Sequence, residues 1–449
     1  MISPTLTWIV GAFKKKKGFK QVPPYPHSQA FTSIERTTET YRLNSNGLIE
    51  ELAIDVPRQD WDINKGKVSD YPCISLRQNA FNYILRTEKF DKNDWVKFGG
   101  AVTSNKHTAP DGSQNADVFE VNGSVHSLKY IEQDVDIKVN NTKAYFSVWV
   151  RDGGGVVGNP GTGFFTLSIW DNVNSNDLTY VTYDIINGVV VDSDGNGPKP
   201  ENIMIKEYLN KWFRVGFMCD VPNGSSGDYK MRLYAAVNNP QTASFPTYLQ
   251  ATNIGQQIQY WGANNTKTQY ALPYIHSDSA FEEVGEDVFY SDSLTDYINS
   301  PTGLWFIHVK MASLENFLKN SSANISLSSG NTNDSITFNF KSSNPNFSMN
   351  INVDGISQAF FQGDLDFSNE IKLAVYYKQN YVELFYNGKS IYTDSTFDTF
   401  ASMVLNKITN DDGGGSDKFE EGDIYQYRFY DVRTLQGAKI KQLQKQLTQ

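Results

Sequence analysis

An acidic stretch near the end of the sequence has the residue types of a glycosidase site. Hydrolysis of a glycosidic bond uses two carboxyl groups, one as the acid and the other as the nucleophile or base. Glu421 and Asp423 would share one strand face, since side chains alternate with a period of two. The next residue on that face is Tyr425, so a row of three acidic residues is incomplete. We therefore predict that this stretch begins the last strand and that the chain is not an enzyme.

Aromatic side chains beside carboxylates and amides are candidates for contacts with sugars. A ring face packs against the apolar C–H face of a pyranose, and a neighbouring carboxylate or amide accepts hydrogen bonds from hydroxyl groups. Trp170-Asp171-Asn172, which we place at a strand end, and Trp261 in the stretch YWGANN have this composition. Trp149, Trp212 and Trp305 lie inside strand-like runs, where core filling is the better interpretation. For Trp170 both interpretations stay open.

Two acidic loops offer oxygen ligands for a structural calcium ion. They are Asp192-Ser193-Asp194-Gly195-Asn196 and Asp411-Asp412-Gly413. The first lacks the glutamate at the twelfth position of a calcium loop, and turns also require Asp, Asn and Gly, so solvated turns are favoured. The 5 histidines form no HExxH or HxH pair, and Cys73 and Cys219 lie far apart. We expect isolated buried thiols, no zinc centre and no cofactor.

The beginning of the sequence combines a short apolar run with a lysine cluster. Residues 6–13 (LTWIVGAF) are too few to span a bilayer, and the positive charges follow this run, whereas a secretory signal carries them before it. We expect neither membrane insertion nor export through a signal peptide. Trp8, Phe13 and the run Lys14, Lys15, Lys16, Lys17 form a candidate docking element for an acidic surface. A solvated tail is the alternative.

The composition favours strands and disfavours binding to nucleic acid. The chain has 449 residues, with 40 Lys and Arg against 50 Asp and Glu, and a net charge of −10. An acidic chain lacks the net electrostatic attraction to the phosphate backbone that drives binding to nucleic acid. Aromatic residues make up 14% of the chain, and they occur with many Asn, Ser, Gly and Asp residues, which form turns. This composition predicts an all-β fold, and at roughly 100–200 residues per domain the length predicts two or three domains.

Short alternating runs separated by turn residues predict the arrangement of strands. Asn46-Gly47 separates two such runs, and Asn387-Gly388 predicts a second hairpin, because Asn-Gly supplies the positive φ angles of a type I′ turn. Residues 435–447 have the apolar spacing of a helix. This helix would pack on its own domain or on a neighbouring subunit.

We predict two tandem β-sandwich (jelly-roll) domains with an extended N-terminal arm and a short C-terminal helix. The arm comprises residues 1–30, and residues 31–80 form a hairpin-containing connecting segment packed on the first sandwich. The first sandwich comprises residues 81–280. The second comprises residues 281–449 and includes the helix.

Several stretches together resemble bacteriophage virion proteins of the tail-fibre and head-fibre type. Residues 31–57 (FTSIERTTETYRLNSNGLIEELAIDVP) and 71–95 (YPCISLRQNAFNYILRTEKFDKNDW) are similar to the opening of that family. Residues 259–277 (QYWGANNTKTQYALPYIHS) resemble the end of a jelly roll of the carbohydrate-binding-module type. Residues 370–393 and 423–444 look like the last third of a concanavalin A-like lectin domain.

This resemblance implies a structural protein on the outer surface of a virion that binds glycans of the host cell. It implies attachment to capsid or tail proteins through the N-terminal arm, and symmetric clustering as a homotrimer would raise the apparent affinity. Two alternatives stay open: an architectural capsid decoration protein that binds no glycan, and a glycan depolymerase. No catalytic residues follow from the resemblance.

Overall fold

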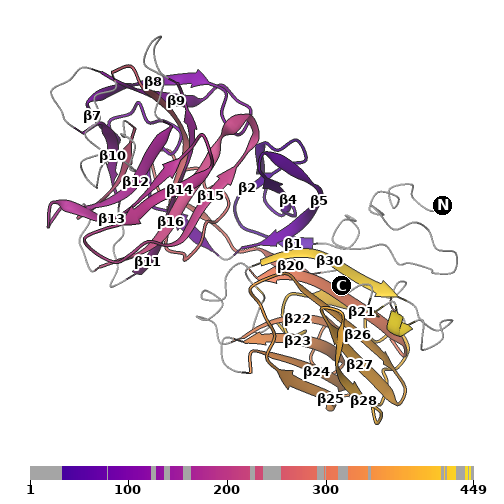
Figure 1. Ribbon diagram of the computed structural model, residues 1–449. Helices are drawn as coiled ribbons and strands as arrows, with labels where there is room; N and C mark the ends of the chain where they lie inside the picture. Colours follow the sequence, from indigo (N-terminus) through magenta and orange to yellow (C-terminus); the bar gives the residue numbers. More distant parts are fainter. Residues whose placement is uncertain are drawn as a thin grey trace, which may run out of the picture.

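The computed structural model of this chain consists of two β-sandwiches and a connecting segment between them (Figure 1). The structure describes residues 33–77, 79–122, 128–135, 142–154, 163–222, 228–235, 254–290, 298, 300–311, 322–341, 345–415, 419, 422–430, 440–442 and 444–445. Nearly every element in these residues is a strand, so the predicted all-β fold class is confirmed. Within this part of the chain, no helix is long and apolar enough to cross a membrane.

The first sandwich packs two antiparallel six-stranded sheets against each other. The β12 sheet has the order β14 (Val189–Asp194), β13 (Asn176–Asp184), β12 (Phe164–Asp171), β17 (Tyr229–Tyr234), β10 (Tyr130–Asp134), β7 (Val96–Phe98). The β11 sheet has the order β15 (Glu201–Glu207), β16 (Phe213–Val221), β11 (Thr142–Asp152), β18 (Gln257–Thr266), β9 (Ala116–Val121), β8 (Gly100–His107). Alternate side chains point inward, among them Leu167, Phe146 and Val215, and they form one fully buried core.

The second sandwich packs two seven-stranded sheets. The β21 sheet has the order β28 (Lys389–Asp394), β27 (Tyr381–Tyr386), β26 (Ile371–Lys378), β21 (Gly303–Met311), β30 (Gly422–Tyr430), β5 (Lys67–Leu76), β4 (Gln59–Asn64). The β23 sheet has the order β1 (Ser33–Glu35), β20 (Val288–Tyr290), β29 (Lys407–Thr409), β22 (Ser322–Ser328), β23 (Ser335–Lys341), β24 (Phe347–Val353), β25 (Ile356–Gly363). Trp305 of β21 stacks on Phe338 of β23 in the core, with ring centroids 4.8 Å apart.

Both predicted Asn-Gly hairpins are present. Asn46-Gly47 lies between β2 (Thr40–Leu43) and β3 (Ile49–Leu52), which pair antiparallel. The Asn44 side chain closes this turn by accepting the N–H of Asn46 at 2.9 Å and that of Leu48 at 3.1 Å. Between β27 and β28, Asn387 and Gly388 have φ angles of 41° and 83°, as a type I′ turn requires.

The connecting segment contacts both sandwiches, whereas we expected it to pack on the first. Its β2–β3 hairpin covers the outer face of the β11 sheet, where Leu43 and Ile49 join an aromatic cluster. Its strand β5 pairs with β30, and β1 pairs with β20, so both extend sheets of the second sandwich (Figure 1). The cause is apolar burial, because Ile74 and Leu76 of β5 are fully buried in the second core.

The end of the chain is helical at residues 440–442 and 444–445, inside the range predicted for the helix. Ile440 is buried with Leu304, Phe306 and Tyr376 on the outer face of the β21 sheet. The side-chain amide of Gln444 donates to the carbonyl oxygen of residue 383 at 3.3 Å. Of the two alternatives, packing on its own domain is therefore the one observed. A short β-pair of β6 (Ala80–Asn82) and β19 (Glu282–Val284) and a 3-10 turn at Leu209–Lys211 complete the elements.

Candidate functional site

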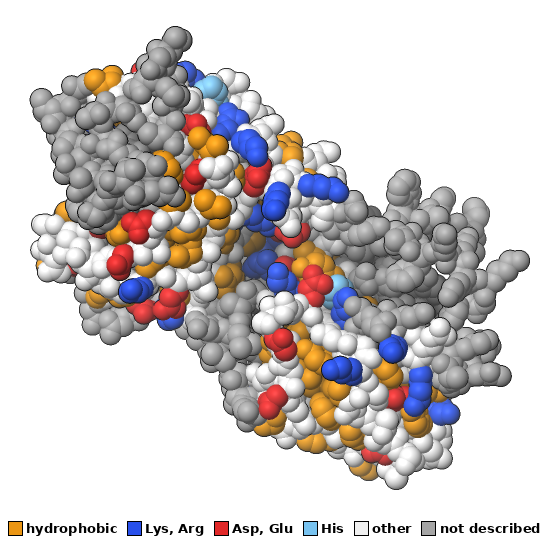
Figure 2. All heavy atoms as spheres, in the orientation of Figure 1, with side chains coloured by type: hydrophobic (Ala, Val, Ile, Leu, Met, Phe, Trp, Pro, Cys, Tyr) orange, Lys and Arg blue, Asp and Glu red, His pale blue; other side chains and the backbone are white. Residues whose placement is uncertain are grey.

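A cavity of about 220 Å³ lies where the connecting segment meets both sandwiches, and we call it the junction cavity. Its walls come from the outer face of the β11 sheet, from β2, β4 and β5 of the connecting segment, and from β21 and β30 of the second sandwich. Figure 2 shows Lys and Arg side chains gathered around the hollow between the two sandwiches. The cavity thus combines side chains that lie far apart in the sequence.

The wall formed by the β11 sheet is a row of three side chains. Lys206 of β15 is in register with Arg214 of β16, which is in register with Trp149 of β11. The Arg214 guanidinium carbon lies 4.2 Å from the centroid of the Trp149 ring, and Nη2 donates to the Ser147 hydroxyl at 3.1 Å. Arg214 is only 5% exposed, and burial lowers its pKa. This wall therefore presents a buried cation stacked on an aromatic ring.

The wall formed by the connecting segment carries an aromatic ring between charged groups. The half-buried ring of Trp61 lies 5.8 Å from the guanidinium carbon of Arg42, whose Nε donates to Glu50 at 2.9 Å. The Asp60 carboxylate accepts the N–H of Leu43 at 2.8 Å. Burial raises the pKa of Asp60 above its ordinary value, although this hydrogen bond acts in the opposite direction.

The wall from the second sandwich contains a tightly held carboxylate. Asp423 of β30 lies 3.0 Å from Nη2 of Arg77, and its Oδ1 accepts a hydrogen bond of 2.7 Å from the Ser75 hydroxyl. Burial by itself would raise the pKa of Asp423, but the Arg77 charge and the two hydrogen bonds outweigh it and hold the pKa below its ordinary value. Lys310 of β21 and Tyr425 of β30 complete this wall.

The junction cavity carries more cationic than anionic groups. Five cationic side chains line it, namely Arg42, Arg77, Lys206, Arg214 and Lys310, and three carboxylates, namely Asp60, Asp62 and Asp423. Lys206 is paired with Asp62 at 2.6 Å. A positive excess in a chain of net charge −10 is a local feature of this site.

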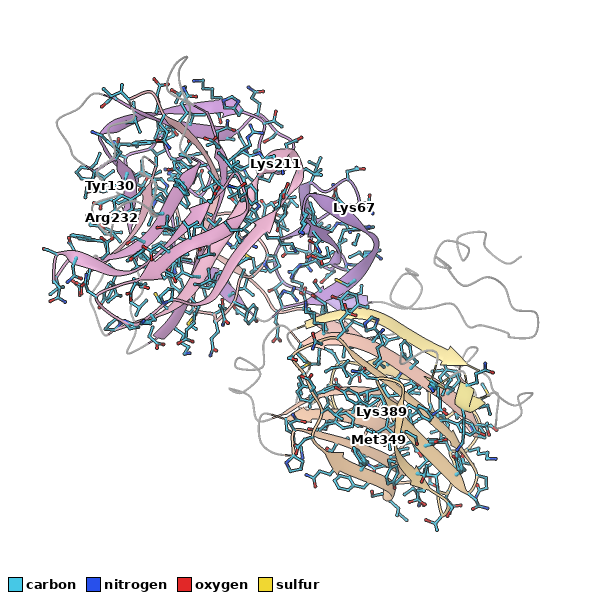
Figure 3. The ribbon with its side chains drawn as sticks, in the orientation of Figure 1. Lys67, Tyr130, Lys211, Arg232, Met349 and Lys389 are labelled. Atoms are coloured by element: carbon cyan, nitrogen blue, oxygen red, sulfur yellow. The ribbon has the colours of Figure 1, made fainter. Side chains whose placement is uncertain are left out.

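The predicted sugar-contacting residues at the end of β12 lie elsewhere, on the outer face of the β12 sheet. The Trp170 ring is half-buried, and the guanidinium carbon of Arg232 lies 3.6 Å from its centroid. Arg232 also lies 4.6 Å from the Tyr130 ring, and the two residues are adjacent in Figure 3. Asp171 shapes the following turn by accepting the N–H groups of residues 173 and 174 at 2.9 Å, and Asn172 is exposed. A sugar contact of these residues stays a prediction.

The prediction that Trp261 is a sugar platform is wrong. Trp261 is 1% exposed and packs against Trp149 and Tyr274, with ring centroids 5.3 and 4.5 Å away. Its neighbour Gly262 has a φ of +64° at an irregularity in the pairing of β11 with β18. The β2–β3 hairpin covers this face of the sheet, so Trp261 fills a core. The same burial confirms the core assignment for the three other tryptophans, Trp149, Trp212 and Trp305.

The two acidic loops have structural partners. Asp192 and Asp194 lie in β14 and face Thr182 and Tyr180 of β13, so the first three residues of this stretch are strand rather than the expected loop, whereas Gly195 and Asn196 follow the end of the strand. Asp411 accepts the N–H of Gly413 at 2.6 Å, as turn residues do. Among the described residues, no group of three or more His, Cys, Asp or Glu side chains is arranged to hold a metal ion.

The remaining predicted residues are the two cysteines, Glu421 and the N-terminal docking residues. Cys73 and Cys219 are free and buried, as predicted. Glu421 lies outside the described residues, and so do Trp8, Phe13, Lys14, Lys15, Lys16 and Lys17.

The residues of the junction cavity were missed by the sequence analysis. Asp60-Trp61-Asp62 has the same mixture of an aromatic ring and carboxylates as Trp170-Asp171-Asn172, and this mixture was the available signal. Arg214 lies in a strand-like run and carries no local signal. Its importance comes from pairing between strands that are distant in the sequence.

No protein-family model and no curated protein sequence matches this chain. Among solved structures, it is weakly similar to domain 4 of an extracellular arabinanase from Geobacillus stearothermophilus in complex with arabinotriose, at 13% identity and a TM-score of 0.29, over 40% of this chain and 82% of that one. It is similar to tailspike protein 4 of bacteriophage CBA120 at 11% identity and a TM-score of 0.24, over 41% of this chain and 21% of that one. For domains LG4-5 of the mouse laminin α1 chain, the identity is 10% and the TM-score 0.23, over 68% of this chain and 88% of that one. At these TM-scores the similarity carries no information on function.

Proposed function

We propose that this protein binds carbohydrate and that the binding site is the junction cavity. The observation that carries the proposal is the presence of aromatic rings and hydrogen-bonding groups around one partly enclosed space. Trp61 and Tyr41 line it together with Asp60, Arg214 and Lys310. A sugar has apolar C–H faces and a rim of hydroxyl groups, so it requires both kinds of contact.

The volume of the junction cavity sets the size of the ligand. The cavity measures about 220 Å³. Pockets for drug-sized ligands are larger, at roughly 300–1,000 Å³. We therefore propose that the cavity encloses one sugar unit at the end of a glycan, with the remainder of the glycan in solvent. Such a site has few contacts, so its affinity as a single copy is low.

We propose binding without hydrolysis. A glycosidase uses a carboxyl group with a raised pKa as the acid and a second, ionised carboxylate, roughly 5–9.5 Å away, as the nucleophile or base. Of the three carboxylates that line the junction cavity, Asp60 has a raised pKa. Asp423 is held by Arg77 at 3.0 Å, and Asp62 by Lys206 at 2.6 Å. We propose that these ion pairs keep Asp423 and Asp62 from acting as the second catalytic group.

We propose further that the protein is displayed on the outer surface of a phage virion as a homotrimer. The support is the sequence resemblance to tail-fibre and head-fibre proteins, together with the low affinity of a single small site, which clustering compensates. Labelling of intact particles with antibodies against the second sandwich tests the location. Light scattering of the purified chain tests the trimer, and a monomeric mass contradicts it.

The binding proposal is tested on a glycan array, followed by titration of the best ligand. We expect Trp61→Ala to weaken binding about tenfold, since loss of a stacked ring and its burial costs roughly 1.4 kcal/mol. Trp170→Ala is the matched control, because Trp170 is also half-buried but lies on the β12 sheet. Loss of binding in Trp170→Ala alone would move the site to that sheet. Release of reducing sugar would contradict binding without hydrolysis, and no binding on the array would contradict the proposed function.

A further inference from the structure

Arg214 is a buried cation without an ionic partner. No carboxylate of the described residues lies within 4 Å of its guanidinium group, and its buried Nε–H has no hydrogen-bond acceptor. Its contacts are with neutral groups, namely the Ser147 hydroxyl, the Tyr208 side chain and the Trp149 ring. Buried charges in proteins are normally paired, since removing a charge from water costs several kcal/mol. Within the described part of the chain, Arg214 therefore lacks an anionic partner.

Other buried arginines of the same protein have their partners. Arg36 donates to Asp287 at 2.9 Å, and Arg232 donates to Glu132 at 2.6 Å. The difference lies in position, because Arg214 lines the junction cavity. An anion that enters the cavity can reach it, whereas Asp60 contributes only a longer-range charge.

We propose that the ligand of the junction cavity is a sugar that carries a carboxylate, which pairs with the guanidinium group of Arg214. This inference rests on the proposed function and narrows it to acidic sugars, such as a uronic or sialic acid at the end of a glycan. The planar guanidinium group matches a carboxylate through two parallel N–H donors. Lys310 adds a second positive charge to the same space.

The remaining contacts of such a ligand follow from the other walls. The Trp61 ring packs against the C–H face of the sugar, and the Asp60 carboxyl group accepts from a hydroxyl group. Arg42, Arg77 and Lys206 are already paired with carboxylates at 2.5 to 3.0 Å. They therefore add to the electrostatic potential of the cavity but form no new ion pair with the ligand. Arg214 and Lys310 thus remain for an acidic sugar, and Arg214 is the one whose planar group matches a carboxylate.

Calorimetric titration of the full chain tests the ligand class, with glucuronic acid, N-acetylneuraminic acid, glucose and inorganic sulfate as probes. We expect at least one acidic sugar to bind at least tenfold more tightly than glucose, and increasing salt to weaken this binding. Equal or tighter binding of glucose overturns the acidic class and leaves the proposed function in place. Sulfate that binds as tightly as the acidic sugar reveals a simple anion site and overturns the inference. If no probe binds, both proposals fail for this cavity.

Variants of Arg214 separate recognition from a structural role. We expect Arg214→Met to remove the preference for the acidic sugar, while its unfolding temperature stays equal or rises, because an unpaired buried charge is replaced by an apolar side chain. Arg214→Lys keeps a charge without the planar group, and we expect a reduced preference. The control is Arg151→Met, which removes an arginine that stacks on Trp212 at 5.0 Å on the same sheet face but does not line the cavity. A preference that persists in Arg214→Met, or that is lost equally in Arg151→Met, overturns the inference.

Discussion

Replacement of Asp287 by asparagine tests whether one buried carboxylate fastens the connecting segment to the second sandwich. Oδ1 of Asp287 accepts from Nη1 of Arg36 at 2.9 Å, and Oδ2 accepts from the N–H of Arg77 at 3.1 Å. Nη1 of Arg58 lies 3.4 Å from Oδ2. The side chains of Asp287 and Arg36 are 0% exposed, and that of Arg58 is 1% exposed. This cluster therefore has one negative and two positive charges, all removed from water.

The burial of this cluster determines how much stability the Asp287→Asn variant is expected to lose. Asp287→Asn keeps the shape of the side chain but leaves two buried guanidinium groups with no negative charge between them, and it turns an amide NH₂ toward groups that are themselves donors. Removal of one partner of a buried ion pair costs roughly 3–5 kcal/mol. In a unit of 150–250 residues, each kcal/mol lowers the unfolding temperature by roughly 2–4 °C, so we expect a decrease of roughly 6–20 °C.

Differential scanning calorimetry of the full chain measures this decrease. Asp278→Asn is the control, because Asp278 also contacts two cations, Arg86 at 2.5 Å and Lys89 at 2.9 Å, but its side chain is 40% exposed. Exposed ion pairs contribute up to about 1 kcal/mol each, so we expect a small change in this variant. A decrease in Asp287→Asn no larger than that in Asp278→Asn would refute the reasoning, because burial would then not determine the cost.

Two further variants test the first sandwich. Burial raises the pKa of Asp117 from 3.8 to about 6. A carboxyl group whose pKa rises on folding stabilises the folded state below about pH 4, and this contribution is lost as the pH rises through about 6. We therefore expect the unfolding free energy of the wild type, relative to Asp117→Asn, to fall between pH 4 and 6 in urea titrations, and a constant difference would count against this. Gly262→Ala would place a methyl group 2.8 Å from a ring carbon of Trp149 at a φ of +64°. We expect it to lower the unfolding free energy by roughly 2–4 kcal/mol, whereas Gly414→Ala in an exposed turn changes it by less than about 0.5 kcal/mol; equal effects would disprove the steric argument.

Local patterns were sufficient for the fold class because each strand carries its own signal. Alternation of apolar residues marks β23 and β26, and Asn387-Gly388 fixes a turn by backbone angles that depend on these two residues alone. The partner of β5 could not be predicted, because it pairs with β30, some 350 positions later in the sequence. The residues of a strand do not indicate which other strand it will pair with. The sequence therefore predicted only that the connecting segment packs on the first sandwich.

The candidate site was less accessible to sequence reasoning. Trp261 and Trp61 both lie beside polar residues, yet one is buried beneath a hairpin and the other lines the junction cavity. The difference depends on which outer sheet face is covered by the connecting segment. Arg214 is recognised as unusual only when the positions of all nearby carboxylates are known. Asp192 and Asp194 were assigned to a loop because their residue types favour turns, but pairing with β13 outweighs that preference.

The pairing of β1 with β20 and of β5 with β30 has a mechanical consequence. Tension applied at residue 33 acts first on β1 and its short ladder with β20 in the second sandwich. Once that ladder has separated, the next element along the chain is the β2–β3 hairpin, which packs on the first sandwich. The ladder between β5 and β30 is loaded last, so a protein tethered at that end would bear load on the two sandwiches alternately.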